Sequence, residues 1–236
     1  MLHCTTRSGK EETRPGIHQH APQVCSRKLF GGCTMTLTTK GQLFVFEGVD
    51  AAGKSSISAR FVDWLRSQGK TAEPFSFPGN FPGTIGDLVY RIHHDRAAFG
   101  LDPLTESSLQ TLHIAAHLDA IEARIIPSLE AGKTVILDRY WWSTRVYGVV
   151  GGARAEVLDK LIEAEQIAWG DWLPTALFCI GRSTPLRDEP LDRWSRWKDG
   201  YDAMIRKESG RYPIHSIQNE SSIEECLSEI TSCCPI

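Results

Sequence analysis

LFVFEGVDAAGKSS, residues 43–56, joins a run of apolar residues to the start of a helical pattern. The run Leu43–Phe46 is continuous, as is typical of a strand buried on both faces of a parallel sheet. After the glycines, apolar residues recur at helical spacing from Ile57 to Leu65, and Gly69 ends the pattern. The stretch therefore predicts a strand, a glycine-rich loop and a helix in direct succession.

The loop Gly48–Ser55 fits the pattern G-x-x-x-x-G-K-[ST] in full, and this pattern binds nucleotide phosphates. Its glycines allow a tight turn and let backbone N–H groups approach phosphate oxygens. Lys54 would neutralise charge on the β and γ phosphates of ATP, and the Ser55 hydroxyl would ligate Mg²⁺. A glycine-rich turn with a solvated lysine is the alternative, but the flanking strand and helix favour a phosphate loop. The expected ATP-binding residues are Gly48, Val49, Asp50, Ala51, Ala52, Gly53, Lys54, Ser55 and Ser56.

Composition narrows the range of partners. The chain has 26 basic and 29 acidic residues and a formal net charge of -3, which argues against a broad basic surface for nucleic acid. No apolar run approaches the roughly 20 residues needed to span a bilayer, and the N-terminus lacks the apolar core of a secretory signal. The seven cysteines contain no C-x-x-C pair, so we expect reduced thiols. We expect a cytoplasmic protein with no nucleic-acid or membrane partner.

The chain divides into two regions. Residues 1–34 show neither helical nor strand periodicity, so we expect a flexible N-terminal extension. Our hypothesis is that Met35 is the natural translation start, because it stands just before the first strand; the intact mass of protein made from the native gene would test this. Residues 35–236 alternate between strand-like and helical patterns, which predicts a five-stranded parallel sheet with helices on both faces and ligands at the carboxyl ends of the strands.

Beyond the first strand and helix, the patterns assign the rest of this domain. Further strands are expected at residues 71–77, 134–137, 176–180 and 212–217. Helices are expected at residues 85–95, 105–131, 142–150, 153–169 and 222–231, with a break or kink at Pro127. Residues 181–200 are rich in Arg, Asp, Pro and Trp and have no simple period, so we expect a small lid there.

The triplet Asp138-Arg139-Tyr140 directly follows the expected strand 134–137. It should therefore lie at the same sheet edge as the phosphate loop. A carboxylate there can hold Mg²⁺, and a guanidinium can bind a phosphate through two parallel hydrogen bonds. A salt bridge at the strand end is the alternative. Because Asp138 and Arg139 are expected beside a phosphate loop, we interpret them as residues of phosphoryl transfer rather than as a structural salt bridge.

Three segments together resemble the thymidylate kinase family. They are Phe46–Ser56, Ile126–Lys133 (IPSLEAGK), and the Asp138-Arg139-Tyr140 triplet followed by Ser143 and Tyr147. The similarity runs in order from about Gln42 to Ile230. The resemblance implies a P-loop NTPase fold and Mg²⁺-dependent transfer of the γ-phosphate of ATP to a nucleoside monophosphate, dTMP giving dTDP. It also implies a homodimer.

The resemblance further implies roles for single residues. Asp50 would contact the 3'-hydroxyl of the acceptor sugar, and Arg139 would hold the acceptor phosphate. Asp138 would organise Mg²⁺ together with Ser55, and Tyr147 would pack beside the acceptor nucleoside. The expected acceptor-binding residues are Asp50, Phe77, Asn80, His113, His117, Arg139, Ser143 and Tyr147.

A catalytic arginine is expected from the lid. Position 51 is Ala, so the phosphate loop supplies no arginine, and the resemblance implies that the lid provides one. The candidates are Arg182, Arg187, Arg193 and Arg196. We favour Arg187 and Arg193, with solvated ion pairs as the alternative for the others. The expected catalytic residues are Lys54, Asp138, Arg139, Arg187 and Arg193.

Three positions depart from the family pattern. His113 stands where the family has the phenylalanine that stacks on thymine, His117 stands where it has an arginine that reads the base, and Asn80 falls near an expected arginine. Histidine can stack and donate hydrogen bonds, but the two histidines could also be partly buried helix residues. A metal pair with Asp119 lacks a third ligand. The departures leave two other functions open: a kinase for a different nucleotide or phosphorylated metabolite, and a catalytically weak ATP-binding regulator.

Overall fold

The computed structural model describes residues 40–79 and 81–234 of the chain. The predicted N-terminal extension, residues 1–34, and the predicted start at Met35 lie outside the described residues. Asn80, one of the predicted acceptor-binding residues, also lies outside them.

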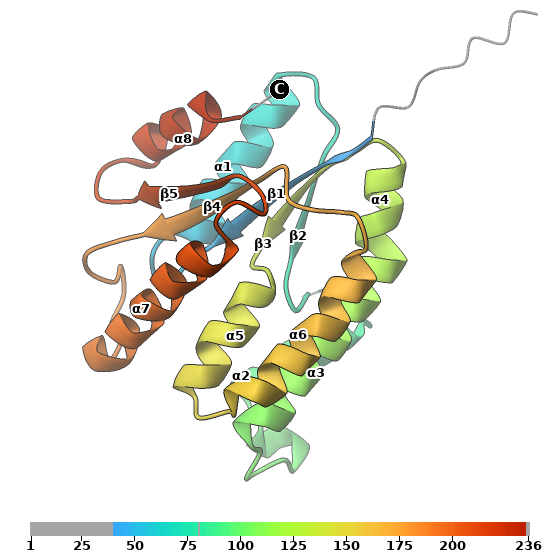
Figure 1. The fold of residues 1–236 in the computed structure, drawn as a ribbon, viewed down its shortest axis with the longest axis vertical. Helices are drawn as coiled ribbons and strands as arrows, with labels where there is room; N and C mark the ends of the chain where they lie inside the picture. Colours follow the sequence, from blue (N-terminus) through green and yellow to red (C-terminus); the bar gives the residue numbers. More distant parts are fainter. Residues whose placement is uncertain (1–39, 80, 235–236) are drawn as a thin grey trace, which may run out of the picture. The chain divides into compact units, whose positions relative to one another are not determined.

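The described residues form one five-stranded sheet in which every pairing is parallel (Figure 1). The strands are β1 (Gln42–Glu47), β2 (Ala72–Ser76), β3 (Thr134–Asp138), β4 (Ala176–Gly181) and β5 (Ile214–Gln218), in the order β2-β3-β1-β4-β5. In the register of β1 and β3, Phe46 pairs with Asp138. The phosphate loop and the Asp138-Arg139-Tyr140 triplet therefore leave the same edge of the sheet from adjacent strands.

Helices cover both faces of this sheet. Successive side chains of a strand point to opposite faces, and Leu43, Phe44, Val45 and Phe46 are all at most 1% exposed. On one side α1 (Lys54–Ser67) packs against α8 (Ile223–Ser232). The other helices are α2 (Ile85–His94), α3 (Glu106–Ala120), α4 (Ile126–Glu130), α5 (Trp141–Val150), α6 (Ala155–Trp169) and α7 (Leu191–Glu208), with a 3₁₀ turn η1 (Ala97–Phe99). The predicted parallel sheet with helices on both faces is confirmed.

None of the helices in the described ranges combines the length and the apolar character that crossing a membrane would require.

One prediction about helices needs correction. The second half of the predicted lid, residues 191–200, is the start of α7, so the irregular segment is only residues 182–190. The helical period is hidden because its buried residues, Trp194, Tyr201 and Met204, are separated by charged residues on the exposed side. Near Pro127 the helix predicted over residues 105–131 changes type: a π-helical turn, η2 (Ile121–Ile125), separates α3 from α4. The wider turn accommodates a residue that has no N–H to donate.

An aromatic cluster joins α1 to the sheet. The ring of Phe61 lies 5.3 Å from that of Phe44, 5.5 Å from that of Phe46 and 5.9 Å from that of Phe178, measured between centroids. Trp64, on the same helix, stacks on Phe61 with centroids 5.6 Å apart. Phe61 itself is 0% exposed, so the helix that follows the phosphate loop is fixed to β1 and β4 through this side chain.

Replacing Phe61 with Ala should lower the free energy of unfolding by about 3–5 kcal/mol, because the substitution leaves a cavity among four aromatic rings. Urea denaturation measures the change. Arg60→Ala, at the exposed neighbouring position of α1, is the control and should change stability by less than about 0.5 kcal/mol. A loss of under about 1 kcal/mol in Phe61→Ala would show that the cluster does not hold α1 to the sheet.

Candidate functional site

The phosphate loop has the backbone that its glycines predict. Gly48 and Gly53 have φ angles of 131° and 92°. A Cβ at Gly48 would lie 2.1 Å from the carbonyl oxygen of Ile180, and one at Gly53 would lie 2.4 Å from Nδ2 of Asn219. Gly53 caps α1 without any side-chain hydrogen bond. The first N–H groups of α1 are thus left for an anion, and the helix dipole favours negative charge there.

Lys54 is buried at the base of this loop. Its side chain is 5% exposed, and its Nζ donates to the backbone oxygen of Val49 at 3.0 Å. Burial and the nearby charge of Arg139 lower the pKa of Lys54 to about 8, although Asp50 and Asp138 act in the opposite direction. An ammonium desolvated to this degree gains strongly from an anionic phosphate.

Ser55 and Asp138 form the part of the site that suits a metal ion. The Ser55 hydroxyl donates to Oδ2 of Asp138 at 2.6 Å. Oδ1 of Asp138 is buried and has no hydrogen-bond partner within the described residues. Buried polar atoms normally have a partner, so a bound ion or water would satisfy this unpaired oxygen. A hydroxyl and a carboxylate are hard oxygen ligands of the kind that Mg²⁺ takes alongside water and phosphate.

A metal site built wholly from protein side chains is absent from the described part of the chain, which contains no group of three or more His, Cys, Asp or Glu residues able to hold an ion. The idea of a metal pair at His113, His117 and Asp119 therefore gains no support.

Arg139 links the triplet to the phosphate loop. Its Nη2 donates to Oδ1 of Asp50, and its Nη1 donates to the Ser143 hydroxyl at 3.0 Å. The guanidinium lies 5.3 Å from the centre of the Tyr147 ring, and the Tyr147 hydroxyl accepts from the backbone N–H of Asp50 at 2.9 Å. Burial alone would raise the pKa of Asp50, but Arg139 and Lys54 outweigh it and hold that pKa below its usual value. Asp50 therefore stays ionised beside the guanidinium.

Glu47, the last residue of β1, lies buried behind the site, and the sequence reasoning gave it no role. Its carboxylate is 0% exposed and accepts from the backbone N–H groups of Tyr140 at 2.7 Å and Ser143 at 3.0 Å. It also accepts from the hydroxyls of Ser143 at 2.9 Å and Tyr201 at 3.0 Å. Burial raises the pKa of Glu47 despite the opposing charge of Arg139. An acidic residue ending an otherwise apolar strand was the available signal.

A cavity of about 490 Å³ opens beside these groups. One part of its wall comes from the sheet edge and α5, and the other part comes from α2 and α3. The lining residues include Asp50, Ser55, Phe77, His113, His117, Asp138, Arg139, Ser143, Tyr147 and Arg187, all of them predicted site residues. They also include Tyr90, His93, His94, Gln110 and Thr144, which sequence reasoning missed. The volume is in the range of a site for a small ligand.

The two predicted histidines have different environments. His117 is 2% exposed, its Nδ1 lies 2.8 Å from Oε2 of Glu165, and its ring stacks on Phe77 with centroids 3.9 Å apart. His113 is less buried, and its Nε2 lies 2.9 Å from Nδ1 of His93. Burial and the neighbouring His117 and His93 hold the pKa of His113 well below its usual value. His117 is thus a buried helix-packing residue, and both histidines also line the cavity.

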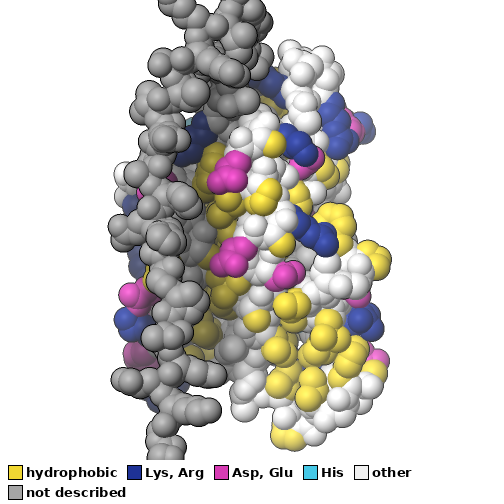
Figure 2. Space-filling model, turned by 90° about the vertical axis from the view of Figure 1, so that its right-hand side faces the viewer, with side chains coloured by type: hydrophobic (Ala, Val, Ile, Leu, Met, Phe, Trp, Pro, Cys, Tyr) yellow, Lys and Arg dark blue, Asp and Glu magenta, His cyan; other side chains and the backbone are white. Residues whose placement is uncertain are grey.

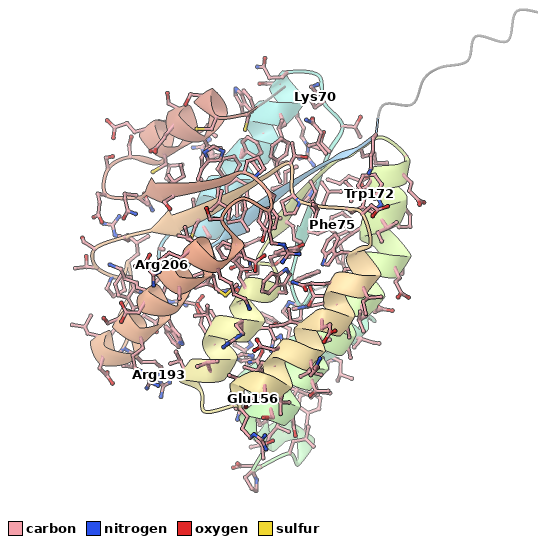
Figure 3. All side chains as sticks on the ribbon, in the orientation of Figure 1. Lys70, Phe75, Glu156, Trp172, Arg193 and Arg206 are labelled. Carbon is pink, nitrogen blue, oxygen red and sulfur yellow. The ribbon has the colours of Figure 1, made fainter. Side chains whose placement is uncertain are left out.

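The four candidate lid arginines differ in whether they line the cavity. Arg187 lines the cavity and pairs with Glu189 at 2.9 Å while its side chain remains 68% exposed. The loop that carries it rests on the phosphate loop, since the N–H of Leu186 donates to the backbone oxygen of Ala51 at 2.8 Å. Arg193 is exposed on the first turns of α7 (Figure 3) and is not among the residues that line the cavity.

Of the other two candidates, Arg182 donates to the backbone oxygen of Asn219, and Arg196 lies 3.5 Å from that of Val150.

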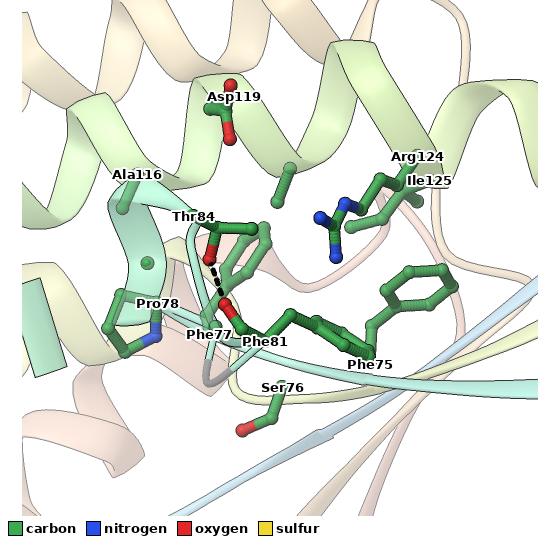
Figure 4. A pocket seen from close by; sticks show the side chains of 13 residues that line it. Phe75, Ser76, Phe77, Pro78, Phe81, Thr84, Ala116, Asp119, Arg124 and Ile125 are labelled. Atoms are coloured by element: carbon green, nitrogen blue, oxygen red, sulfur yellow. Dashed lines mark hydrogen bonds between the residues drawn. The ribbon is translucent and has the colours of Figure 1, made fainter. Parts of the chain in front are cut away.

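A second hollow lies under the loop that follows β2 (Figure 4). Its volume is about 10 Å³, which is room for about one water molecule. The Arg124 guanidinium stands 4.8 Å from the Phe81 ring centre, and the Thr84 hydroxyl donates to the Phe81 oxygen at 2.7 Å. These contacts hold the loop against η2 and α2, and the hollow is too small for a substrate.

Comparison with known proteins gives a consistent result. The family model "Thymidylate kinase" matches residues 46–166. A thymidylate kinase of Symbiobacterium thermophilum is 31% identical over 202 residues, covering 78% of this chain and 88% of that protein. A thymidylate kinase of Jannaschia sp. strain CCS1 is 37% identical over 131 residues, covering 52% of this chain and 60% of that protein. The crystal structure of a thymidylate kinase from Ehrlichia chaffeensis matches with a TM-score of 0.67 at 22% identity, covering 82% of this chain and 98% of the other.

The low pKa of Lys54 predicts proton uptake when a nucleotide binds. The pKa is about 8 without ligand, and anionic phosphates beside the ammonium favour its charged form, so binding raises the pKa. At about pH 8.5, ADP binding should therefore take up roughly half a proton or more. Calorimetry in buffers with different ionisation enthalpies measures the uptake. Lys54→Met should abolish it, and a binding enthalpy that does not depend on the buffer would contradict the prediction.

Proposed function

Since the chain belongs to the thymidylate kinase family, we propose that it transfers the γ-phosphoryl group of ATP to the 5'-phosphate of dTMP, giving ADP and dTDP. The observation that carries the proposal is the shared cavity. Ser55 and Asp138 line it at the sheet edge, and Asp50, Arg139 and Tyr147 stand beside them. A donor held by the phosphate loop and an acceptor in the cavity would therefore meet at one point.

On the donor side, the loop Gly48–Ser56 would bind the phosphates of ATP through its backbone N–H groups. Lys54 would lie against the β and γ phosphates, because its Nζ already points into the loop toward the Val49 oxygen. Its burial means that the charge acts where little water screens it. This positions and neutralises the transferring group without a covalent intermediate.

Ser55 and Asp138 would hold Mg²⁺, through the hydroxyl oxygen and the carboxylate oxygens. The metal would neutralise charge on the β and γ phosphates as the phosphoryl group moves. The unpaired Oδ1 of Asp138 supports this assignment.

On the acceptor side, Arg139 would bind the 5'-phosphate through its two terminal nitrogens. Those nitrogens are now held by Asp50 and Ser143, so the guanidinium is already oriented before the acceptor arrives. Asp50 would then face the sugar 3'-hydroxyl, and Tyr147, which packs on Arg139, would cover the sugar. With the phosphate at the sheet edge, the base would extend toward the wall formed by α2 and α3, where His113 and His117 lie and where Phe77 stacks on His117.

We propose Arg187 as the lid arginine. It lines the cavity on a loop hydrogen-bonded to the phosphate loop, and its ion pair within the described residues is with Glu189. The Arg187 side chain is 68% exposed, so its guanidinium can turn from Glu189 toward a phosphate, and ion pairs of such exposed groups contribute about 0–1 kcal/mol.

We also propose that the protein is cytoplasmic, acts without nucleic acid and forms a homodimer. Apolar side chains stand exposed on one face of the molecule (Figure 2), and Ile167 of α6 is 76% and Leu173 is 50% exposed. Burial of such groups against a second copy is favourable by about 25 cal/mol per Å². Sedimentation velocity would show a dimer, and a monomer at micromolar concentration would contradict the proposal.

ADP formation from ATP and Mg²⁺ should depend on dTMP. Lys54→Ala should reduce kcat/KM for the transfer by about 10³-fold or more, because it removes the buried charge that faces the phosphates. A coupled assay for ADP measures both, and thermal unfolding checks that the variant folds. ADP release that is the same with and without dTMP would refute the proposed reaction.

Arg187→Ala should lower kcat for this transfer by about 10³-fold, with little change in the KM for dTMP, since a lid arginine acts on the transition state. Arg193→Ala tests the other favoured candidate and should have kcat close to that of the unaltered protein. Arg206→Ala, an exposed arginine farther along α7 (Figure 3), serves as the surface control. A loss below tenfold in Arg187→Ala, or a larger one in Arg193→Ala, would overturn the assignment.

A further inference from the structure

Helix α7 carries three aromatic side chains on the face that it packs against the site. Trp194, Trp197 and Tyr201 follow one another at spacings of three and four residues, which places them on one side of a helix. α7 packs beside α5 (Figure 1), and α5 carries Ser143 and Tyr147. The aromatic face of α7, formed by these three side chains, is therefore turned toward residues proposed to bind the acceptor.

The Tyr201 hydroxyl completes the surroundings of the Ser143 hydroxyl. It lies 2.9 Å from Oγ of Ser143 and donates to Oε2 of Glu47 at 3.0 Å. Ser143 donates to the same Glu47 oxygen at 2.9 Å and accepts from Nη1 of Arg139 at 3.0 Å. Burial raises the pKa of Tyr201 well above its usual value, and the charge of Glu47 adds to the effect, so the hydroxyl keeps its proton. A serine hydroxyl has one proton and two lone pairs. Its contacts with Glu47, Tyr201 and Arg139 use this full capacity and fix the oxygen that faces the guanidinium.

The Trp194 indole fixes the second group that holds Arg139. It is 4% exposed, and its Nε1 donates to the backbone oxygen of Asp50 at 2.8 Å. The backbone N–H of Asp50 donates to the Tyr147 hydroxyl at 2.9 Å, so this residue is tied on both sides. The next residue, Ala51, has a φ angle of 58°, which residues with a side chain rarely adopt. Its surroundings therefore impose this backbone, and with it the place of the Asp50 carboxylate that accepts from Nη2 of Arg139.

Trp197 supports the third group around the guanidinium. Its ring packs on that of Tyr147 with centroids 4.8 Å apart. The Tyr147 ring in turn lies 5.3 Å from the guanidinium carbon of Arg139. The three groups already found around Arg139 are a carboxylate, a hydroxyl and a phenol ring. Each of them is thus contacted by one residue of the aromatic face of α7.

Building on the proposed function, we propose that the aromatic face of α7 positions Arg139 for the acceptor phosphate. Tyr201 acts through Ser143. Trp194 acts through Asp50. A guanidinium binds a phosphate through two parallel hydrogen bonds that lie in its own plane, and the two groups that hold its terminal nitrogens set that plane before the acceptor arrives. α7 follows directly after the loop that carries the proposed lid arginine, so one segment of the chain acts on both phosphates.

Tyr201→Phe removes one hydroxyl and keeps the ring. It should weaken dTMP binding by about tenfold or more, because the guanidinium loses its fixed direction toward the phosphate. ADP binding to the phosphate loop should stay within about twofold. Titration calorimetry with each ligand measures both dissociation constants. If the unaltered protein binds dTMP and Tyr201→Phe binds it as tightly, this inference alone fails; if the unaltered protein does not bind dTMP, the proposed function fails.

Arg139→Lys separates positioning from a general effect on folding. An ammonium is a point charge without a planar fork, so its contact with a phosphate does not depend on the orientation of a plane. Trp194→Phe removes the indole N–H and should weaken dTMP binding as Tyr201→Phe does. In the Arg139→Lys background, each of the two substitutions should change the dissociation constant for dTMP by less than about twofold. A purely structural role would weaken binding equally in both backgrounds, and that result would overturn the inference.

A hydrogen bond between Trp142 and Tyr212 supplies matched controls. Nε1 of Trp142 donates to the Tyr212 hydroxyl at 3.1 Å, both side chains are buried, and neither residue is among those that line the cavity. Trp142→Phe and Tyr212→Phe each remove one partner of this bond, as the test variants do at α7. Both should bind dTMP within about twofold of the unaltered protein. Weakening as large as that in Tyr201→Phe would show that the loss of any such bond is sufficient, and the role of the aromatic face would be refuted.

Discussion

The carboxylate of Glu47 holds together three segments that lie far apart in the sequence. It ends the central strand β1, and it accepts hydrogen bonds from Tyr140 and Ser143 at the start of α5 and from Tyr201 of α7. A buried carboxylate without a direct cationic partner is costly unless hydrogen bonds satisfy it. In this structure hydrogen bonds satisfy the carboxylate. They also fix Gly48, the first glycine of the phosphate loop, and the residue before Tyr140 relative to Glu47.

That residue is Arg139, whose backbone has a φ angle of 75°. An arginine rarely takes this left-handed conformation, and it persists only where the surroundings impose it. The N–H of Arg139 donates to the Phe46 oxygen at 2.9 Å, and the next N–H donates to Glu47. The turn directs the guanidinium back toward Asp50 of the phosphate loop. The strained backbone at Arg139 thus results from joining the ends of β1 and β3 around the Glu47 carboxylate. The same turn places the Arg139 cation beside the phosphate loop before any ligand binds.

The features that could be predicted from the sequence are those set by local pattern. The continuous apolar runs of β1 and β3 predict buried parallel strands, and adjacency of their ends follows from that topology. Glycines at 48 and 53 predict the loop backbone. Residues 191–200 were assigned wrongly because one buried tryptophan among charged residues does not show a helical period until Tyr201 and Met204 follow. The His93–His113 contact depends on how α2 packs on α3, and no pattern within either helix specifies that packing.

The cavity has an uneven distribution of charge, because one of its walls is built from the ends of the strands and the other from helices. Cations gather where the strands end, since Lys54 and Arg139 both belong to segments tied to β1 and β3. The opposite wall is made of α2 and α3, where His93 contacts His113 and His117 is held between Phe77 and Glu165. His117, at the position where the resemblance places an arginine, makes a buried contact from α3 to Glu165 of α6. Because charge is concentrated at the strand ends, a nucleotide in such a cavity would be oriented chiefly by its phosphate.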